Sequence, residues 1–296
     1  MRSLRRRLGP RLGLHRQYSP RPLVLRLPAP PRTHSDDLPD ISIVTPSFNQ
    51  GRFLERTVRS VLEQGYSGLE YIVQDGGSTD ETAAILGRYS SAFATCDSRK
   101  DRGQAHALNL GFSRSRGSIL AYLNSDDLLL PGALAAVGSY FAEHPDVDVL
   151  YGHRIVIDEE DNEIGRWVML PHEDRALKWN DYIPQETLFW RRRIWDAIGG
   201  CFDESFHYAL DWDILLRFRE AGAKFVRLPR FLGAFRIHDS QKSTLHVRTI
   251  GLQEARRLRQ RVHGRSVSKW ESRCRVVPYL CKHVIYDWMH RCGLAA

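Results

Sequence analysis

The stretch 119–127, Ile-Leu-Ala-Tyr-Leu-Asn-Ser-Asp-Asp, decides which fold this chain is expected to adopt. Its first five residues are apolar, and their number suits one buried strand of a parallel sheet. The polar tetrad Asn124–Asp127 then lies at the carboxyl end of that strand. Ligands of open parallel sheets bind beyond these strand ends, and a pair of carboxylates there can hold a divalent cation. The alternative is that the two Asp residues only cap the following segment.

The same order of strand, polar turn and helix recurs on both sides of this stretch. Apolar periodicity predicts strands at 41–46, 69–74 and 147–151, and helices at 51–63, 81–89, 103–115 and 132–143. Ser78 or Thr79 is the expected N-cap of the helix that begins at residue 81. Such alternation predicts an α/β fold with a mainly parallel sheet that is covered by helices.

Beyond residue 151 the pattern is less regular. A hairpin is predicted through residues 158–162, and a helix at 210–221 is followed by apolar segments at 225–228 and 231–237. From about residue 247 the chain is basic and helical. Two apolar stripes are expected there, one of Leu252, Ala255, Leu258 and Val262, the other of Val277, Leu280, Cys281, Val284, Ile285 and Trp288. The second stripe is expected to pack on its own domain, with contact to a membrane surface as the alternative that nearby cations suggest.

Charge divides the chain into three parts. Residues 1–35 hold nine Arg and no acid, and residues 251–296 hold ten Lys or Arg against three acids, although the net charge is only +8. The body between them is acidic, which argues against a nucleic-acid-binding core. Basic tails suit anionic lipid or other polyanions. We therefore expect a disordered Pro/Arg-rich leader (1–38), one globular domain (39–245) and a basic helical tail (246–296).

Prolines in the leader argue against a helical transit peptide, so disorder or an over-extended start of the reading frame is expected. No apolar run approaches the roughly 18 residues that a spanning helix requires. The five Cys are odd in number and form no C-x-x-C pair. These features predict a cytoplasmic protein, with peripheral contact at the inner face of the cytoplasmic membrane as a possible addition.

Four polar groups fall at the predicted strand ends or in loops: residues 45–49, 75–80, 102–104 and 124–127. In this order they closely resemble the family 2 glycosyltransferases, enzymes of the GT-A fold that transfer a sugar from a nucleotide diphosphate donor. The resemblance runs from about Pro39 to Ser243. It is carried by Ile-Val-Thr-Pro-Ser-Phe-Asn, Asp-Gly-Gly-Ser-Thr-Asp, Leu-Asn-Ser-Asp-Asp and, at 209–213, Ala-Leu-Asp-Trp-Asp. It implies a Rossmann-like GT-A domain with a C-terminal helical extension.

The resemblance also implies which residues bind the donor. Thr45 and Asp75 would meet the nucleotide base and ribose, although Asp75 also suits a role in forming its own turn. Gly76 stands where the commoner family pattern, Asp-Asp-Gly-Ser, has a second Asp, and this puts uridine specificity in doubt. Arg102 precedes a Gly-Gln helix start, where it would bind the diphosphate unless it is a surface arginine.

The acidic motif would bind the metal. Asp127 would coordinate Mg²⁺ or Mn²⁺, which bridges the phosphates and neutralises the charge of the leaving group. Asp126 would contact the ribose or the donor sugar. The resemblance places His238 near the metal or the diphosphate, with a purely structural histidine as the alternative.

Asp211 matches the general base of the family, and Asp213 is its rival. Deprotonation of an acceptor hydroxyl during a single displacement would invert the anomeric configuration. Polar and aromatic side chains at Gln185, Glu186, Trp190 and Trp212, with Trp179 nearby, would form the acceptor wall, since aromatic faces stack on sugars. Trp residues at this density equally suit a core.

The sequence thus predicts a metal-dependent, inverting glycosyltransferase that acts on a saccharide or lipid-linked acceptor in polysaccharide or cell-envelope glycan synthesis. The main alternative is an inactive nucleotide-sugar-binding protein of the same fold. A sugar nucleotidyltransferase would need a Gly-rich phosphate loop, which residues 47–51 (Ser-Phe-Asn-Gln-Gly) lack, and no G-x-G-x-x-G supports a nicotinamide enzyme. The prediction requires Asp126, Asp127 and Asp211 to face one cleft.

Overall fold

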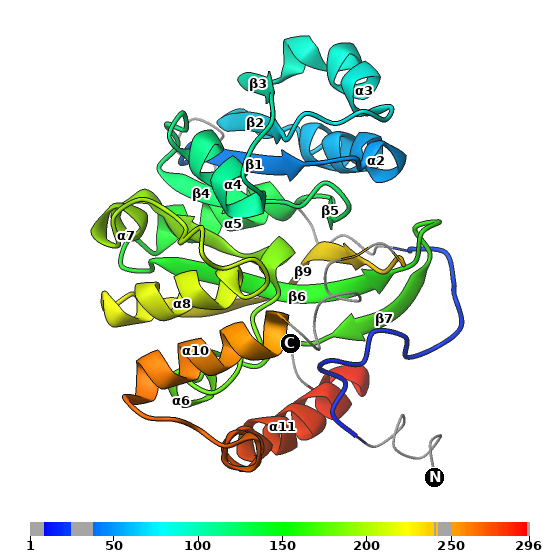
Figure 1. The fold of residues 1–296 in the computed structure, drawn as a ribbon. Helices are drawn as coiled ribbons and strands as arrows, with labels where there is room; N and C mark the ends of the chain where they lie inside the picture. The colour runs from blue at the N-terminus through cyan, green and yellow to red at the C-terminus, as the bar shows by residue number, and fades with distance from the viewer. Residues whose placement is uncertain (1–8, 25–37, 240, 242–249, 295–296) are drawn as a thin grey trace.

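The computed structural model describes residues 9–24, 38–239, 241 and 250–294 of the 296-residue chain. Its described residues form one mixed sheet flanked by helices, as Figure 1 shows, in the strand order β3-β2-β1-β4-β8-β6-β9-β5 with β7 paired to β6. The strands are β1 (Ile41–Ser47), β2 (Leu69–Asp75), β3 (Thr95–Ser98), β4 (Ile119–Tyr122), β5 (Leu128–Leu129), β6 (Val149–Ile157), β7 (Glu163–Trp167), β8 (Phe189–Arg191) and β9 (Phe225–Arg236).

The helices occur in the same order as the sequence pattern predicts, with short additions. They are α2 (Gly51–Leu62), α3 (Thr82–Arg88), α4 (Gln104–Phe112), α5 (Ala133–Glu143), α6 (Asp174–Leu177), α7 (Arg192–Ala197), α8 (Leu210–Glu220), α10 (Leu252–His263) and α11 (Lys269–Arg291), with 3₁₀ turns η2 (Ser90–Ala92) and η3 (Gln185–Thr187). The expected α/β class is confirmed.

The first half of the sheet is the parallel sheet that the sequence predicts. β1 pairs in parallel with β2 and β4, and β2 pairs in parallel with β3. Every residue of β1 is buried, as expected for a strand covered on both faces. The carboxyl ends of β1, β2 and β4 therefore meet at one edge. The expected N-cap of α3 was wrong: Glu81 takes that position, because the Ser78 hydroxyl donates instead to Asp75 Oδ1 (2.5 Å).

The second half of the sheet is mixed. β8 is antiparallel to both β4 and β6, whereas β6 and β9 are parallel. The predicted hairpin is the β6–β7 pair, and the two apolar segments predicted after residue 224 are one strand, β9. β5 lies antiparallel beside β9. This arrangement brings the end of β9 next to the residues that follow β4.

The leader differs from the expectation of disorder where the structure describes it. Within residues 9–24, the Gln17 N–H donates to the Ile164 carbonyl (2.8 Å), and the Arg21 N–H donates to that of Glu163 (3.1 Å). These residues lie along the exposed edge of β7. The free backbone N–H and C=O groups of an edge strand can pair with an extended segment, so the leader needs no helix to be ordered there. Residues 1–8 and 25–37, and the predicted domain boundary at 245/246, lie outside the described residues.

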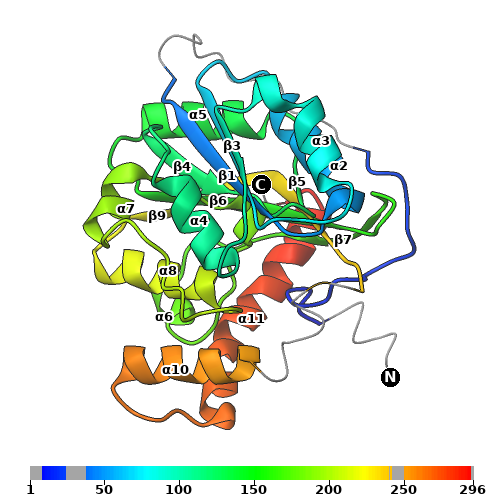
Figure 2. The ribbon, with the colours of Figure 1, turned by 45° about the horizontal axis from the view of Figure 1, so that its top comes forward.

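The two C-terminal helices lie together at the end of the molecule away from α2 and α3 (Figures 1 and 2). α10 inserts Leu258 into the core, and Ala255 and Val262 pack beside it, so the first predicted stripe is confirmed except at Leu252, which is exposed. In the described part of the chain, no helix combines the length and the apolar character that a bilayer span requires.

Candidate active site

Hydrogen bonds from two neighbouring elements hold the acidic motif that follows β4. The buried Asp127 carboxylate accepts the backbone N–H of Arg236 at Oδ1 (3.0 Å). The Thr57 hydroxyl, on α2, lies 2.9 Å from the carbonyl oxygen of Ser125 and 2.8 Å from that of Asp127. The turn that carries both Asp residues is thus tied to α2 on one side and to β9 on the other.

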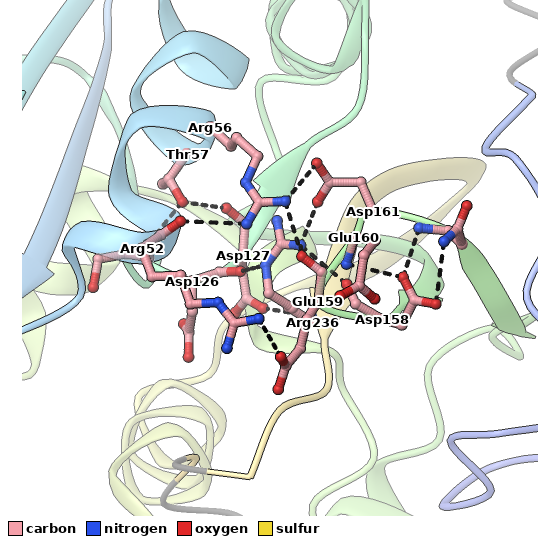
Figure 3. A network of polar contacts seen from close by, with 12 residues as sticks. Arg52, Arg56, Thr57, Asp126, Asp127, Asp158, Glu159, Glu160, Asp161 and Arg236 are labelled. Atoms are coloured by element: carbon pink, nitrogen blue, oxygen red, sulfur yellow. Dashed lines mark hydrogen bonds and ion pairs between the residues drawn. The ribbon is translucent and has the colours of Figure 1, made fainter.

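Arg236, at the end of β9, organises the surroundings of this motif and was not assigned a role from the sequence. Its buried side chain donates from Nε to the Asp126 carbonyl (2.8 Å) and from a terminal nitrogen to the Asp158 carbonyl (3.0 Å). The same guanidinium pairs with Asp161 of the β6–β7 hairpin and lies over the ring of Phe53. Figure 3 shows this network.

Two arginines of α2 join the same hairpin. Arg52 pairs with Glu159, and Arg56 pairs with Asp161 at 3.0 Å (Figure 3). Cations from α2 and β9 thus pair with two of the hairpin's acids, Glu159 and Asp161, and hold the hairpin beside the motif. In the hairpin, Glu159 and Asp161 are used in ion pairs within the protein. Asp126 and Asp127 of the motif remain the candidates for ligand binding.

His238 reaches the motif. Its Nε2 lies 3.0 Å from Asp126 Oδ2, and its ring packs 4.6 Å from the ring of Phe53, centroid to centroid. The imidazole thus orients the Asp126 carboxylate, which was predicted to meet the ribose or sugar. A role of His238 at a metal remains a prediction.

The donor set fits a cation that a ligand helps to hold. No group of three or more His, Cys, Asp or Glu side chains suited to a metal occurs among the residues that the structure describes. Mg²⁺, however, is commonly bound through one or two carboxylates together with substrate phosphates. Burial, with the negative charges of Asp126 and Glu186, raises the pKa of Asp127 well above its usual range. A bound cation would offset this accumulation of negative charge.

Asp211 lies in the first turn of α8 and connects to the motif through a chain of hydrogen bonds. The Tyr122 hydroxyl donates to Asp211 Oδ1. The carbonyl of Tyr122 accepts Gln185 Nε2 (2.7 Å), and Gln185 Oε1 accepts Asn124 Nδ2 (3.0 Å). Tyr122 ends β4, so the strand that leads to the acidic pair also holds Asp211. The structure therefore links Asp211 to the strand that precedes the acidic motif.

Glu254 of α10 caps the helix that carries Asp211. Its two carboxylate oxygens accept the backbone N–H groups of His207, Tyr208 and Ala209, each at 2.8 Å. Ala209, the N-cap residue of α8, has no side-chain cap of its own. A buried carboxylate at a helix N-terminus satisfies free N–H groups and is favoured by the helix dipole. The segment before Asp211 is thus positioned by the C-terminal extension.

Asp213, the predicted rival of Asp211, has another role. Its buried carboxylate pairs with Arg217 of the same helix (2.9 Å) and with Arg261 of α10 (2.5 Å). Both ion pairs are fixed within the protein, one along α8 and the other between α8 and α10. Asp213 attaches α10 to the domain.

The two residues predicted to meet the nucleoside face inward. Thr45 is fully buried, and its hydroxyl lies 3.1 Å from that of Tyr71. The Asp75 carboxylate accepts the N–H groups of Gly77 (3.2 Å) and Ser78 (3.0 Å) and the Ser98 hydroxyl (2.5 Å). Asp75 therefore forms its turn, the alternative that the sequence left open. Thr45 presents no polar atom to a ligand in this geometry.

Two residues missed by the sequence analysis lie at the same strand ends. Phe48 is 60% exposed directly after β1, although it is a large aromatic residue. A Cβ atom added at Gly76 would lie 2.9 Å from Asp101 Oδ2 and 3.2 Å from the Phe48 ring. The Asp101 carboxylate thus borders the place where the commoner family pattern has an Asp side chain. Phe48 could have been identified from the sequence, because it is a large apolar residue just after a predicted strand.

Arg102 is exposed and paired. Its guanidinium forms a two-pronged ion pair with Glu204, with distances of 2.9 to 3.1 Å. Glu204 lies in the segment that precedes Asp211, so this ion pair joins the start of α4 to the segment before α8. An anionic ligand of Arg102 would have to replace Glu204.

The predicted acceptor wall was wrong for both tryptophans. Trp190 is fully buried among Phe112, Trp195 and Phe218, and Trp212 is buried with its indole N–H donating to the Leu177 carbonyl (2.7 Å). Their sequence density reflects a core, the alternative considered above.

Gln185 and Glu186, the other two residues of the predicted acceptor wall, are buried and support the site from inside the protein. Gln185 joins the hydrogen bonds between Tyr122 and Asn124. Glu186 is buried and holds Arg154 in a two-pronged ion pair at 2.5 and 2.6 Å. Both residues stabilise the arrangement from inside, because neither presents an exposed side chain.

Comparisons with known proteins identify the family of this chain. The family model for glycosyl transferase family 2 matches residues 42–207. The chain is 30% identical over 187 residues to a chondroitin synthase of Escherichia coli, a match that covers 62% of this chain and 27% of that protein. It is 33% identical over 186 residues to an uncharacterized glycosyltransferase of Mycobacterium tuberculosis, covering 60% of this chain and 68% of that one.

Among solved structures, TarS 1–349 of S. aureus in complex with UDP-GlcNAc is similar, with a TM-score of 0.62 at 15% identity. That similarity covers 83% of this chain and 73% of the TarS chain. It supports the GT-A architecture that the sequence predicts. Since the family model covers more than half of the 296 residues and the fold agrees, this chain belongs to glycosyl transferase family 2.

Proposed function

We propose that this chain transfers a sugar from a nucleotide diphosphate sugar to an acceptor hydroxyl and inverts the anomeric configuration. The observation that supports this most is the link from Asp211, through Tyr122 and Gln185, to the acidic motif. It joins a candidate base and a candidate cation ligand across one strand end. An inactive binding protein would have no need of a carboxylate held in this way.

In the proposed reaction, Asp211 takes the proton of the acceptor hydroxyl as its oxygen attacks the anomeric carbon, and the nucleoside diphosphate leaves from the opposite face. The Tyr122 hydroxyl keeps the Asp211 carboxylate oriented, and Glu254 keeps the start of α8 in place. Asp127 would hold Mg²⁺ or Mn²⁺ together with the donor phosphates. That cation would supply charge neutralisation at the leaving group.

We propose that the donor base stacks on Phe48, because an exposed aromatic ring at the end of β1 borders the loops after β2 and β3. Asp101 would take the place of the acid that Gly76 lacks. Arg102 would exchange Glu204 for the diphosphate, since a guanidinium binds phosphate in the same two-pronged manner as carboxylate. The UDP-GlcNAc complex of TarS supports a nucleotide-sugar donor.

The acceptor is proposed to be a saccharide or a lipid-linked glycan. Similar proteins include a hyaluronan synthase of Pasteurella multocida (25% identical) and a PGL/p-HBAD biosynthesis glycosyltransferase of Mycobacterium bovis (30% identical). The matches cover 22% and 69% of those proteins. All five cysteines are exposed and unpaired, which suits the reducing conditions of the cytoplasm, the compartment that we propose.

The test is thermal stabilisation by nucleotide sugars with and without Mn²⁺, followed by assays of donor hydrolysis and transfer. A donor should raise the melting temperature only when the cation is present, because a ligand bound by the native state stabilises it. Asp127→Ala should abolish this cation-dependent shift and lower activity at least about a hundredfold. Asp146→Ala, at a carboxylate whose side chain is 62% exposed, is the matched control. Full activity of Asp127→Ala with unchanged cation dependence would refute the assignment.

A further inference from the structure

Helix α11 buries several polar side chains and exposes several large apolar ones. The residues that it buries include the polar Ser272, His283 and Asp287. The residues that it exposes include Trp270, at 76%, and Ile285, at 60%. The expectation that the second apolar stripe packs on its own domain was therefore wrong for its exposed members. Large apolar side chains gathered on one exposed face mark an interaction surface.

These exposed residues form one continuous line. Along α11 every step between them is three or four residues, so they share a single helix face. We name this face the apolar stripe; it comprises Trp270, Cys274, Val277, Cys281, Ile285 and Trp288, all of them exposed. At about 1.5 Å per residue the stripe is roughly 27 Å long. A surface of this length exceeds what scattered exposed residues would produce.

The opposite face of α11 attaches the helix to the domain through polar contacts as well as packing. Asp287 pairs with Arg11 of the leader (3.4 Å), and a second pair with Arg291 (3.0 Å) lies within α11 itself. Tyr279 is buried and packs against Tyr182, with ring centroids 4.6 Å apart. The attachment of the helix thus does not use the apolar stripe.

A basic cavity borders the stripe. It has a volume of about 640 Å³ and lies between α6, the α10–α11 connection and α11. Its lining includes five Lys or Arg residues and one acid, Glu173, together with His263; the five cations are Arg175, Lys178, Arg265, Arg275 and Lys282. Cys274 belongs both to this lining and to the stripe. The cavity and the stripe are therefore neighbouring parts of one surface.

The charge of this surface stays positive when its ion pairs are included. Lys282 pairs with Glu173, Arg265 pairs with Glu271, and Arg291 pairs with Asp287. Even so, residues 265–292 hold six Lys or Arg against two acids. Helical spacing places Arg273 and Arg291 along one edge of the stripe, and Arg275 and Lys282 along the other. An apolar face bordered by cations on both sides is typical of a helix that lies in the plane of an anionic membrane.

We propose that the apolar stripe and the basic cavity together dock this protein on an anionic phospholipid bilayer. Trp270, Ile285 and Trp288 enter the interfacial region, and the cavity receives a phosphate-bearing headgroup. A second copy of this chain is the less suitable occupant, because a symmetric pair would bring two equally basic surfaces together. Docking would hold the transfer site at the surface where a lipid-linked acceptor resides, a consequence that rests on the proposed function.

The test is co-sedimentation with phosphatidylcholine vesicles that contain phosphatidylglycerol, compared with phosphatidylcholine alone. The full chain should bind only the anionic vesicles, and less at high salt. Trp270→Ser with Trp288→Ser should weaken binding at least tenfold. Arg275→Ser with Lys282→Ser should weaken it about fivefold for each cation removed. Tryptophan fluorescence should be quenched by brominated lipid in the wild type and not in the double Trp variant.

The controls are matched by exposure. Val24→Ser removes an apolar side chain that is 68% exposed, and Arg59→Ser with Arg88→Ser removes two exposed, ion-paired cations from α2 and α3. Both controls should bind vesicles like the wild type. Equal binding by the double Trp variant, or no binding by the wild type, overturns the proposal. So does a dimer in sedimentation equilibrium that the stripe variants dissociate. Transfer to a soluble acceptor, which the stripe variants should retain, reports separately on the proposed function.

Discussion

The helices α2 and α11 distribute their apolar residues in opposite ways. α2 buries Phe53, Leu54, Val58 and Val61 against the parallel half of the sheet and exposes Arg52. α11 buries His283 and Asp287 and exposes Trp270 and Trp288. The hydrophobic effect is enough to explain where α2 lies. It does not explain the outward face of α11, which is why we propose a partner for that face.

Helix α10 connects these two kinds of construction. Leu258 packs into the core in the ordinary way, while Glu254 and Arg261 reach the segment around the start of α8. The C-terminal extension is therefore part of the site as well as a neighbour of the proposed membrane surface. The comparison shows that α10 and α11 attach to the domain through buried polar side chains as well as apolar ones, whereas α2 is held mainly by apolar burial.

The largest expected effect separates two acids that are two positions apart. Asp211→Asn should lower kcat by about 10²- to 10⁴-fold, because the general base is lost, while donor binding and melting temperature stay near those of the wild type. Asp213→Asn should instead lower the free energy of unfolding by roughly 1–3 kcal/mol, since two guanidinium groups lose their partner. Kinetics and thermal unfolding of both variants decide. The reverse pattern would assign the base to Asp213.

The next effect measures the contrast between α2 and α11 directly. Leu54→Ala should lower the free energy of unfolding by about 2–5 kcal/mol, because Leu54 is fully buried. Ile285→Ala should change it by no more than about 0.5 kcal/mol. Urea unfolding of the two variants gives both numbers. A similar loss in both would mean that the apolar stripe is packed inside the protein.

A smaller effect is expected at the link between α10 and the site. Glu254→Gln removes one of two carboxylate acceptors and the charge at the start of α8, and it should cost roughly 1–3 kcal/mol of stability. Because the segment before Asp211 would shift, kcat should fall by about tenfold or more, with a smaller change in KM. Glu63→Gln, at an exposed carboxylate of α2, is the control. Unchanged kcat in Glu254→Gln would limit Glu254 to a role in stability.

The smallest effect concerns acid sensitivity of the α11 attachment. Burial, with the charges of Arg11 and Arg291, lowers the pKa of His283 to about 4, while Asp287 acts in the opposite direction. Between the ordinary pKa of about 6.5 and this value, the unfolded chain binds a proton that the folded chain excludes. Stability therefore falls as the pH drops through this window.

The free energy of unfolding of the wild type should fall between pH 7 and pH 5. In His283→Gln this fall should be smaller by about 1–2 kcal/mol. Denaturant unfolding at both pH values measures it, and the other histidines cancel in the comparison with the wild type. His207→Gln, at an exposed histidine, should leave the loss unchanged. The same loss in His283→Gln as in the wild type would show that α11 does not respond to this proton.

The parts of the fold that sequence reasoning predicted well are those with local signals. β1, α2, β2, β4 and α5 each carry a periodic apolar pattern within a few residues of their observed ends. The acidic motif was found because it directly follows a strand. Arg236 and Glu254 were missed as organising residues, since their partners lie 110 and 45 positions away. β5 and β8 carry too few residues for a periodic signal, and β3 (Thr-Cys-Asp-Ser) lacks the apolar run that identified β4.

By itself, the sequence determined the strand and helix order of the parallel half, the family motifs and the existence of an apolar stripe on α11. Spacing along a helix fixes which side chains share a face, because it depends only on local geometry. Only the tertiary structure decided that Trp190 and Trp212 belong to the core, that Asp213 is an attachment point, and that the stripe faces outward. These outcomes depend on which distant surfaces meet, and no local periodicity contains that information.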